Sequence, residues 1–233
     1  MRRLYTFVAV FASLFAVAQG VPVNELIGDF NPAQHPGFVK IDAQYTEKSD
    51  IYLRKEAYAA FVNMAKAAGE AGFTLNILSA TRNFSYQKGI WERKWEQPKY
   101  MGWGAIDRSI DILKFSAMPG SSRHHWGTDI DLNALDNRWF ESGEGKRLYD
   151  WLCTHAPNYG FHQVYTSKSN GRTGYEEEKW HWSYLPLAEP FLQQYNLKLT
   201  NQSLGKFKGS ETAVELKIVE NYVNGIHPSI QKK

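Results

Sequence analysis

Cysteine is nearly absent from this sequence. Cys153 is the only cysteine among 233 residues, which excludes an intramolecular disulfide framework. Leu148, Trp151 and Leu152 surround it with helical spacing, and this pattern predicts a buried structural thiol. Internal repeats and low-complexity tracts are absent as well.

Excess charge of one sign is also small. The 27 Lys and Arg residues against 24 Asp and Glu residues leave a formal charge of +3. Removal of Arg2 and Arg3 with an N-terminal segment would leave 25 cations against 24 anions. The sequence pI of about 8.8 is therefore no argument for a nucleic-acid partner.

A confident membrane-spanning run is missing too. Residues 4–17 are apolar and follow Arg2 and Arg3, but the run is too short to cross a bilayer with confidence. Ala18 and Gly20 supply small residues where a signal peptidase cuts. We expect residues 1–20 to be a signal peptide and the mature protein to be periplasmic or extracellular, without a membrane anchor.

The apolar and aromatic content is high enough to fill a proper core. With 43% apolar and 15% aromatic residues, one folded domain with appended segments is expected. That domain covers 21–195 and begins with an irregular lead over 21–50, and 196–233 forms a connector and a helical tail. Hydrophobic periodicity predicts helices over 55–69, 144–155, 187–195 and 212–223, and strands over 73–80, 128–132, 161–165 and 180–184.

Three further features of the sequence place elements along the chain. The apolar face of the helix over 55–69 is expected to consist of Tyr58, Phe61, Val62 and Ala65. Asn83 offers an N-cap for a further helix, which carries Gln87, Ile90, Trp91 and Trp95. Residues 98–120 are interpreted as a loop with a short helix, in a position to form a wall or lid of a cleft.

Two short motifs carry metal-binding chemistry. Residues 122–131 read SRHHWGTDID, and EKWH follows at 178–181. His124, Asp131 and His181 supply two imidazoles and a carboxylate, and Glu178 is a spare carboxylate. A catalytic zinc ion takes three such protein ligands and keeps a fourth position for water. The motifs therefore predict a metal site with an adjacent base.

The local pattern indicates how these groups meet. Gly127 allows the backbone to bend before the strand that carries Asp131. Alternation along the second strand predicts that His181 points to one face and that Trp180 and Trp182 point to the other. Glu178 is placed in the loop before this strand, within reach of the water that it would deprotonate.

Neighbouring residues offer alternatives. Strand alternation turns His125 away from the metal, so it is interpreted as a supporting or surface residue. Asp129 shares a strand face with Asp131, and geometry alone leaves both open as the ligand. For Glu178 the alternative is membership of the solvated acidic run 176–178.

The motifs resemble those of the VanY-type D-alanyl-D-alanine carboxypeptidases, which are grouped with D-Ala-D-Ala dipeptidases and the hedgehog fold. The pattern S-x-H-x-x-G-x-x-x-D followed by E-x-x-H is met in full. Upstream, SATRNFSYQ at 79–87 is similar to the family segment S-G-Y-R-S-x-x-x-Q, from which it departs at Ala80 and Thr81. The resemblance extends over residues 73–184.

The resemblance implies an α+β fold with a small antiparallel sheet and flanking helices. It also implies Zn²⁺ as the cofactor, although sites of this kind accept other divalent ions. The planar guanidinium of Arg82 suits an oxyanion or a carboxylate. The implied roles are zinc binding by His124, Asp131 and His181, acid/base catalysis by Glu178, oxyanion stabilisation or substrate binding by Arg82, and substrate binding by Ser122 and Gln87.

The implied reaction is removal of a terminal residue from D-amino-acid-containing stem peptides of peptidoglycan or its precursor. A peptidoglycan endopeptidase that cuts cross-links would use the same zinc apparatus and is one alternative. A non-catalytic zinc-binding domain is the other, and the presence of Glu178 and Arg82 argues against it. The sequence does not determine the oligomeric state.

Overall fold

The structure is a computed structural model that describes residues 20–230. The predicted signal peptide, apart from Gly20, lies outside the described residues. None of the helices within 20–230 has the length and apolarity needed to cross a membrane.

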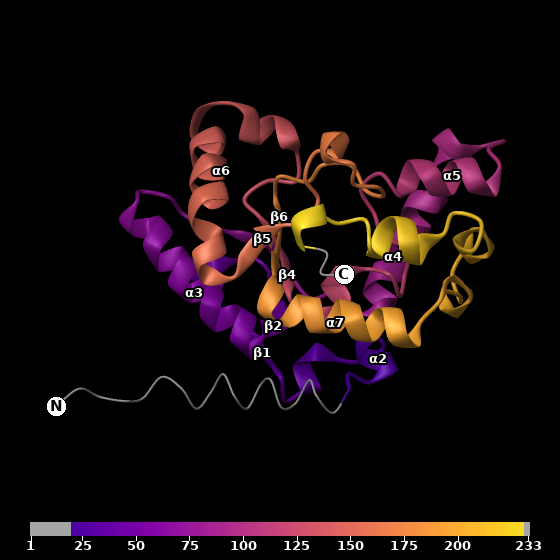
Figure 1. Cartoon of the computed structure of the whole chain (residues 1–233), viewed down its shortest axis with the longest axis horizontal. Coiled ribbons are helices and arrows are strands. Elements are labelled where there is room, and N and C mark those ends of the chain that lie inside the picture. The colour runs from indigo at the N-terminus through magenta and orange to yellow at the C-terminus, as the bar shows by residue number, and fades with distance from the viewer. Residues whose placement is uncertain (1–19, 231–233) are drawn as a thin grey trace.

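Short strands at the centre are surrounded by helices (Figure 1). The strands are β1 (Phe38–Lys40), β2 (Tyr52–Arg54), β3 (Ile77–Ser79), β4 (Asp129–Leu132), β5 (Phe161–Gln163) and β6 (His181–Tyr184). The α-helices are α2 (Val23–Leu26), α3 (Lys55–Glu70), α4 (Phe84–Trp95), α5 (Ala105–Ile112), α6 (Gly143–His155) and α7 (Leu185–Lys198). The predicted α+β fold is confirmed.

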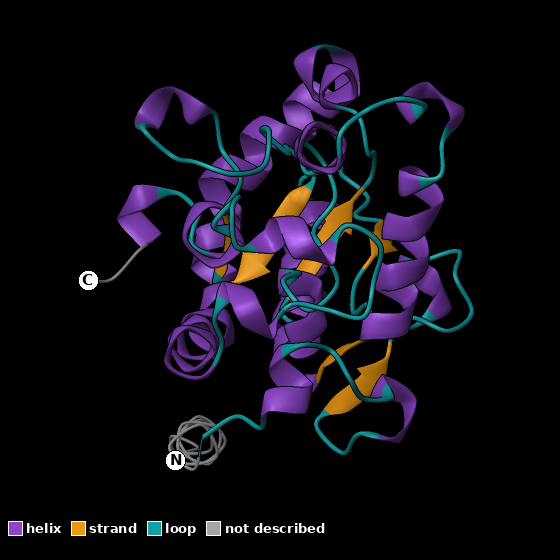
Figure 2. Cartoon of the chain, turned by 90° about the vertical axis from the view of Figure 1, so that its right-hand side faces the viewer, coloured by secondary structure: helices purple, strands orange, loops and turns teal. Residues whose placement is uncertain are grey.

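The strands form two small antiparallel sheets. The larger has the order β3-β4-β6-β5, and β1 and β2 form a separate pair (Figure 2). In the larger sheet Asp131 of β4 lies directly opposite His181 of β6. Directly opposed residues on antiparallel strands have Cβ atoms about 5 Å apart, so this register brings two of the predicted metal ligands together.

Helices α3 and α6 pack against one face of the larger sheet. Phe61 of α3 and Leu148 of α6 share a buried cluster with Ile130 and Trp182 of the sheet. The predicted helix over 55–69 is confirmed, but its buried stripe is formed by Ala57, Phe61, Met64 and Ala68 instead of Tyr58, Phe61, Val62 and Ala65.

A second cluster lies on the side of α4 and α5 and includes the C-terminal segment. Leu204, Phe207 and Ile218 are buried together with Trp91 of α4 and Tyr175. The helix predicted over 212–223 is wrong: a 3₁₀ turn over Ser210–Ala213 is followed by a π-helical turn over Val219–Val223. Tertiary packing of these apolar side chains overrides the amphipathic pattern.

Three further expectations need correction. The lead over 21–50 is not wholly irregular, because it contains α2 and β1. Cys153 is exposed, since the buried side of α6 is formed by Gly145, Leu148 and Leu152. Trp180 precedes β6 and lines the same cavity as His181, so it does not follow the strand alternation.

Candidate metal and catalytic site

The sheet register positions two of the three predicted metal ligands. The Oδ1 atom of Asp131 lies 3.1 Å from Nδ1 of His181 across the β4–β6 pair. Both side chains are almost fully buried. Cross-strand pairing is therefore enough to place Asp131 beside His181, and no special loop is needed.

His124 reaches the same point from a turn. It lies in a 3₁₀ turn over Arg123–Trp126, which ends at Gly127 with a φ of +70°. Its Nδ1 is 2.7 Å from the Ala80 carbonyl and donates to it, which directs Nε2 toward the other two ligands. That Nε2 lies 3.2 Å from His181 Nδ1 and 3.4 Å from Asp131 Oδ1.

These three donor atoms fit a zinc ion. All lie within 4.8 Å of one another, and the pairwise distances above are 3.1, 3.2 and 3.4 Å. Tetrahedral zinc with ligands at about 2.0–2.1 Å separates its donors by roughly 3.3 Å. Two imidazoles and one carboxylate also match the donor types of catalytic zinc sites. The structure therefore brings together the three residues that the sequence predicted.

Asp129, the alternative to Asp131 as a metal ligand, lies at the other nitrogen of the His181 ring. Its Oδ1 accepts from His181 Nε2 at 2.9 Å, on the side of the ring away from Asp131. The same oxygen accepts from Arg123 Nε at 3.1 Å, and Arg123 also donates to Ser183 at 2.7 Å. Asp129 therefore orients His181 from behind, while Asp131 faces the other donors.

The electrostatics of this cluster favour ionised aspartates. Burial opposes ionisation of Asp131, but His124 and His181 outweigh burial and hold its pKa well below the usual value. Burial lowers the pKa of His181, but hydrogen bonds to Asp129 and Asp131 raise it to about 9. Burial keeps the pKa of His124 below its usual value. A bound cation would take the place of the proton on His181.

Glu178 lies in the loop before β6, as the sequence predicted. Its Oε2 is 3.7 Å from His181 Nδ1, and the residue is only 7% exposed. Burial raises the pKa of Glu178 to about 7, with Asp131 adding to the shift and His181 and Arg82 opposing it. Burial at this position excludes the solvated acidic run as its environment. A carboxyl group with a pKa near 7 suits both acceptance and return of a proton.

The backbone around Glu178 is held by long-range contacts. Its N–H donates to the Tyr165 carbonyl at 2.9 Å, and Gln163 donates to its carbonyl at 3.2 Å. Asn137 brackets the residue, because its amide donates to the Glu177 carbonyl at 2.7 Å and accepts from the Lys179 N–H at 3.0 Å. The sequence contained no local signal for Asn137, since it lies some forty positions away.

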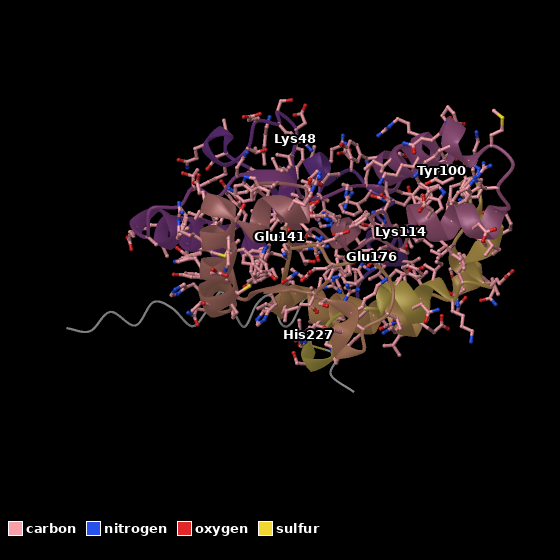
Figure 3. All side chains as sticks on the ribbon, turned by 90° about the horizontal axis from the view of Figure 1, so that it is seen from above. Lys48, Tyr100, Lys114, Glu141, Glu176 and His227 are labelled. Carbon is pink, nitrogen blue, oxygen red and sulfur yellow. The ribbon has the colours of Figure 1, made fainter. Side chains whose placement is uncertain are left out.

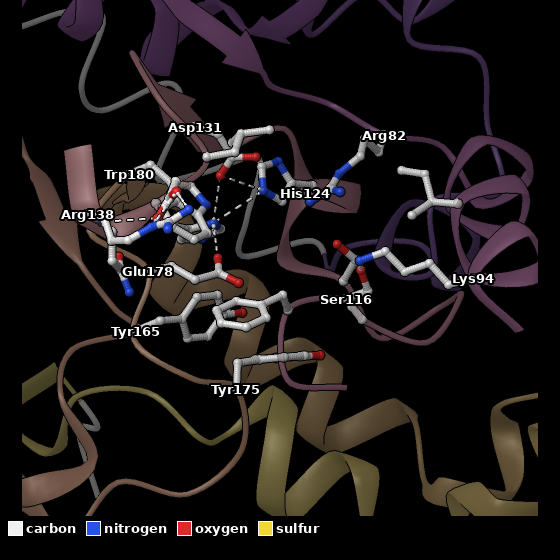
Figure 4. A pocket seen from close by; sticks show the side chains of 18 residues that line it. Arg82, Lys94, Ser116, His124, Asp131, Arg138, Tyr165, Tyr175, Glu178 and Trp180 are labelled. Carbon is white, nitrogen blue, oxygen red and sulfur yellow. Dashed lines mark hydrogen bonds and ion pairs between the residues drawn. The ribbon is translucent and has the colours of Figure 1, made fainter. Parts of the chain in front are cut away.

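The metal ligands and Glu178 line one cavity of about 640 Å³. In Figure 4 His124 and Asp131 lie at its upper side, with Trp180 and Arg138 on one flank and Arg82 on the other. Arg82 has no side-chain hydrogen bond or ion pair within residues 20–230, and its Nε is buried without a partner. An unpaired guanidinium beside a metal site is suited to an anionic group of a ligand.

His125 supports Arg82 instead of binding the metal. Its ring is fully buried, and Nδ1 donates to the Arg82 carbonyl at 2.6 Å. Its Nε2 accepts from the Gly120 N–H at 3.0 Å. Burial lowers the pKa of His125 to about 3, so it is neutral and both contacts persist at neutral pH. The supporting role is the one that the structure shows, and a surface position is excluded.

The two predicted substrate contacts have different positions. Ser122 lines the cavity beside His124. Gln87 does not: it is fully buried in α4 and donates to the Ala117 carbonyl at 2.7 Å. Gln87 thus supports a wall residue of the cavity and makes no contact with its interior.

The segment after α5 and the 166–177 loop complete the wall. Phe115, Ser116 and Ala117 line the cavity from the first of these segments. Seen from above, Lys114 and Glu176 lie next to each other (Figure 3), and the Glu176 N–H donates to the Lys114 carbonyl at 2.8 Å. The sequence predicted that 98–120 would form a wall or lid, and the structure shows a wall.

Comparison with known proteins agrees with this geometry. Residues 50–187, more than half of the chain, match the VanY family, described as D-alanyl-D-alanine carboxypeptidase. The chain belongs to the VanY family. The family predicted from the sequence is therefore confirmed.

Two curated relatives are similar over part of their length. YodJ of Bacillus subtilis, provisionally described as a carboxypeptidase, is 27% identical over an alignment of 169 residues, and the match covers 69% of this chain and 56% of that protein. A D-alanyl-D-alanine carboxypeptidase of Enterococcus faecalis is 27% identical over 109 residues, 47% of this chain and 39% of that protein. The VanY-family chain thus spans about half the length of the first and less of the second.

Solved structures share the fold. VanYB in complex with D-alanine-D-alanine has a TM-score of 0.53 at 23% identity and covers 72% of this chain and 87% of its own. The LD-carboxypeptidase LdcB has a TM-score of 0.55 at 24% identity, and the match covers 76% of this chain and 77% of LdcB. At this level of identity the likeness establishes the fold alone.

Proposed function

We propose that this VanY-family chain is a zinc-dependent D-alanyl-D-alanine carboxypeptidase that acts on peptidoglycan stem peptides. One observation carries the proposal: Glu178, with a pKa raised to about 7, lies beside three converging metal donors in a cavity that Arg82 also lines. A purely structural metal site is closed by its ligands and needs neither group.

The residues present define the roles in hydrolysis. Zinc held by His124, Asp131 and His181 would acidify the attacking water and polarise the scissile carbonyl. Glu178 accepts the proton of that water and returns it to the leaving amine. Arg82 offsets the negative charge that develops on the carbonyl oxygen. Burial of the site strengthens each of these electrostatic interactions.

The proposed substrate also bears on location. Assembled peptidoglycan lies outside the cytoplasmic membrane, so an enzyme that acts on it there has to be exported. The apolar run over 4–17 after two arginines supports this, and we propose a periplasmic or extracellular location.

The decisive test is the substitution E178Q, assayed on a pentapeptide that ends in D-Ala-D-Ala. We expect wild-type protein to release D-alanine and E178Q to lose about 10²- to 10⁴-fold in kcat, because the proton acceptor is removed. Zinc content measured on both proteins should be equal. E177Q is the matched control from the same acidic run, and its activity should be unchanged.

The same assay separates the alternatives. A tetrapeptide with an L,D terminal bond distinguishes LD- from DD-carboxypeptidase activity, and a cross-linked muropeptide detects endopeptidase activity. Full activity of zinc-loaded E178Q would rule out Glu178 as the base. Chelation should abolish release of D-alanine, and added zinc should restore it.

A further inference from the structure

Besides Arg82 and Arg138, the cavity is lined by the cationic residue Lys94, which the mechanism above does not use. It extends from the last turn of α4, and its Nζ donates to Ser116 Oγ at 2.5 Å. Both residues line the cavity. Figure 4 shows Lys94 and Ser116 on the same flank as Arg82, and Glu178 lies across the cavity from them.

The charges of the cavity wall leave this ammonium without a counterion. Arg138 pairs with Asp136 at 2.6 Å, but Lys94 forms no ion pair with any residue between 20 and 230. Its partner Ser116 is a neutral hydroxyl and cannot balance the charge. Burial lowers the pKa of Lys94, and attraction by Glu178 opposes this shift. A partly desolvated ammonium of this kind is stabilised when a ligand brings an anion.

We propose that Lys94, held in place by Ser116, binds the terminal carboxylate of the substrate and is a specificity-determining residue. The inference rests on the proposed function. Lys94 provides a point charge for the carboxylate, and this leaves the guanidinium of Arg82 for the oxyanion. A peptide that continues beyond the cleaved bond would leave the ammonium unpaired. The enzyme therefore favours a chain end over a cross-link.

A carboxylate can come from the chain end or from an acidic side chain within the peptide. Three forms of the pentapeptide distinguish them: the free acid, the C-terminal amide and a form with amidated acidic side chains. Wild-type protein should prefer the free acid over the C-terminal amide, and side-chain amidation should have little effect.

The variant K94M should raise KM for the free acid about 10- to 100-fold and affect kcat less, because a charge-assisted hydrogen bond to the ground state is lost. Hydrolysis of the C-terminal amide should not change, so the preference for the free acid disappears. K88M, a lysine variant in the same helix, should retain the preference. K94R should restore part of it.

Binding is measured separately from hydrolysis. Calorimetric titration of zinc-loaded E178Q and E178Q/K94M with the free acid and the amide reports the preference without turnover. If wild-type protein cleaves neither peptide, the proposed function fails, and the calorimetric preference still decides the role of Lys94. Equal affinity of E178Q for acid and amide overturns the inference. The inference is also overturned if K94M hydrolyses the free acid and the C-terminal amide less well by the same factor. It is overturned as well if hydrolysis by the wild-type protein falls only when the acidic side chains are amidated.

Discussion

At the scale of single residues, His181 is held from both sides of its ring. Asp131 faces Nδ1 at 3.1 Å, and Asp129 accepts from Nε2 at 2.9 Å. A carboxylate behind a histidine ligand fixes the tautomer and raises the basicity of the nitrogen that binds the metal. Asp129 is therefore a positioning residue, which acts on the metal through His181.

The substitution D129N tests this role. We expect the affinity for zinc to fall about 10- to 100-fold, as is typical when the partner of a histidine ligand is removed. Competition with a chromophoric chelator measures the affinity. D150N, on the exposed side of α6, provides a control that should bind zinc as the wild type does.

Arg123 complicates the single substitution, because D129N removes its buried counterion. The double variant R123M/D129N removes both charges and should show the same loss of zinc affinity with a smaller loss of stability. Wild-type affinity in a folded double variant would mean that Asp129 does not position His181.

At the scale of elements, the turn before β4 depends on Gly127. Its φ of +70° is in the left-handed region that glycine adopts freely. A Cβ at this position would lie 2.3 Å from Cε1 of Phe38 in β1. The turn that presents His124 therefore requires both the backbone conformation and the missing side chain.

G127A should destabilise the protein by more than the roughly 1–3 kcal/mol of a strained backbone conformation, because Phe38 must also move. Denaturant unfolding measures the loss. G72A is the matched control, since Gly72 also has a positive φ but no atom within 4 Å of the added Cβ. Equal losses in the two variants would show that the contact with Phe38 contributes nothing.

At the scale of the whole molecule, metal loading and pH are coupled. In the metal-free protein the pKa of His181 is raised from 6.5 to about 9, so the stability that its proton contributes is complete below pH 6.5 and is lost toward pH 9. The pKa of Glu178 is raised from 4.5 to about 7, and its ionisation destabilises the fold over that window. Both pKa values are raised, so both groups make the metal-free protein less stable as the pH rises.

We therefore expect chelated protein to lose a few kcal/mol of stability between pH 5 and pH 9. Zinc-loaded protein should lose less, because the metal takes the place of the proton on His181. Urea unfolding at pH 5.5, 7 and 9, with and without chelator, measures the difference. If the stability difference between zinc-loaded and chelated protein shrank with rising pH, the charge states assigned to the site would be wrong.

The sequence by itself determined much of the site. Residue types at 124, 131, 178 and 181 predicted the metal donors and the base, because a metal accepts few donor types and the spacing within each of the two motifs is short. Local signals also placed Asn83 at the start of α4, where its side chain accepts from the Tyr86 N–H at 2.8 Å. These features depend on neighbours in the chain.

Only the tertiary structure decided what depends on distant residues. Asp129 and Asp131 share a strand face, and the position of the His181 ring between them separates their roles. Lys94 and Asn137 carry no motif, and they reach the cavity because α4 and the segment after β4 pack around it. Gln87 lies in the predicted helix, but that packing turns it away from the cavity. Chemistry is encoded in residue type and spacing, whereas the orientation of a side chain is set by what packs against it.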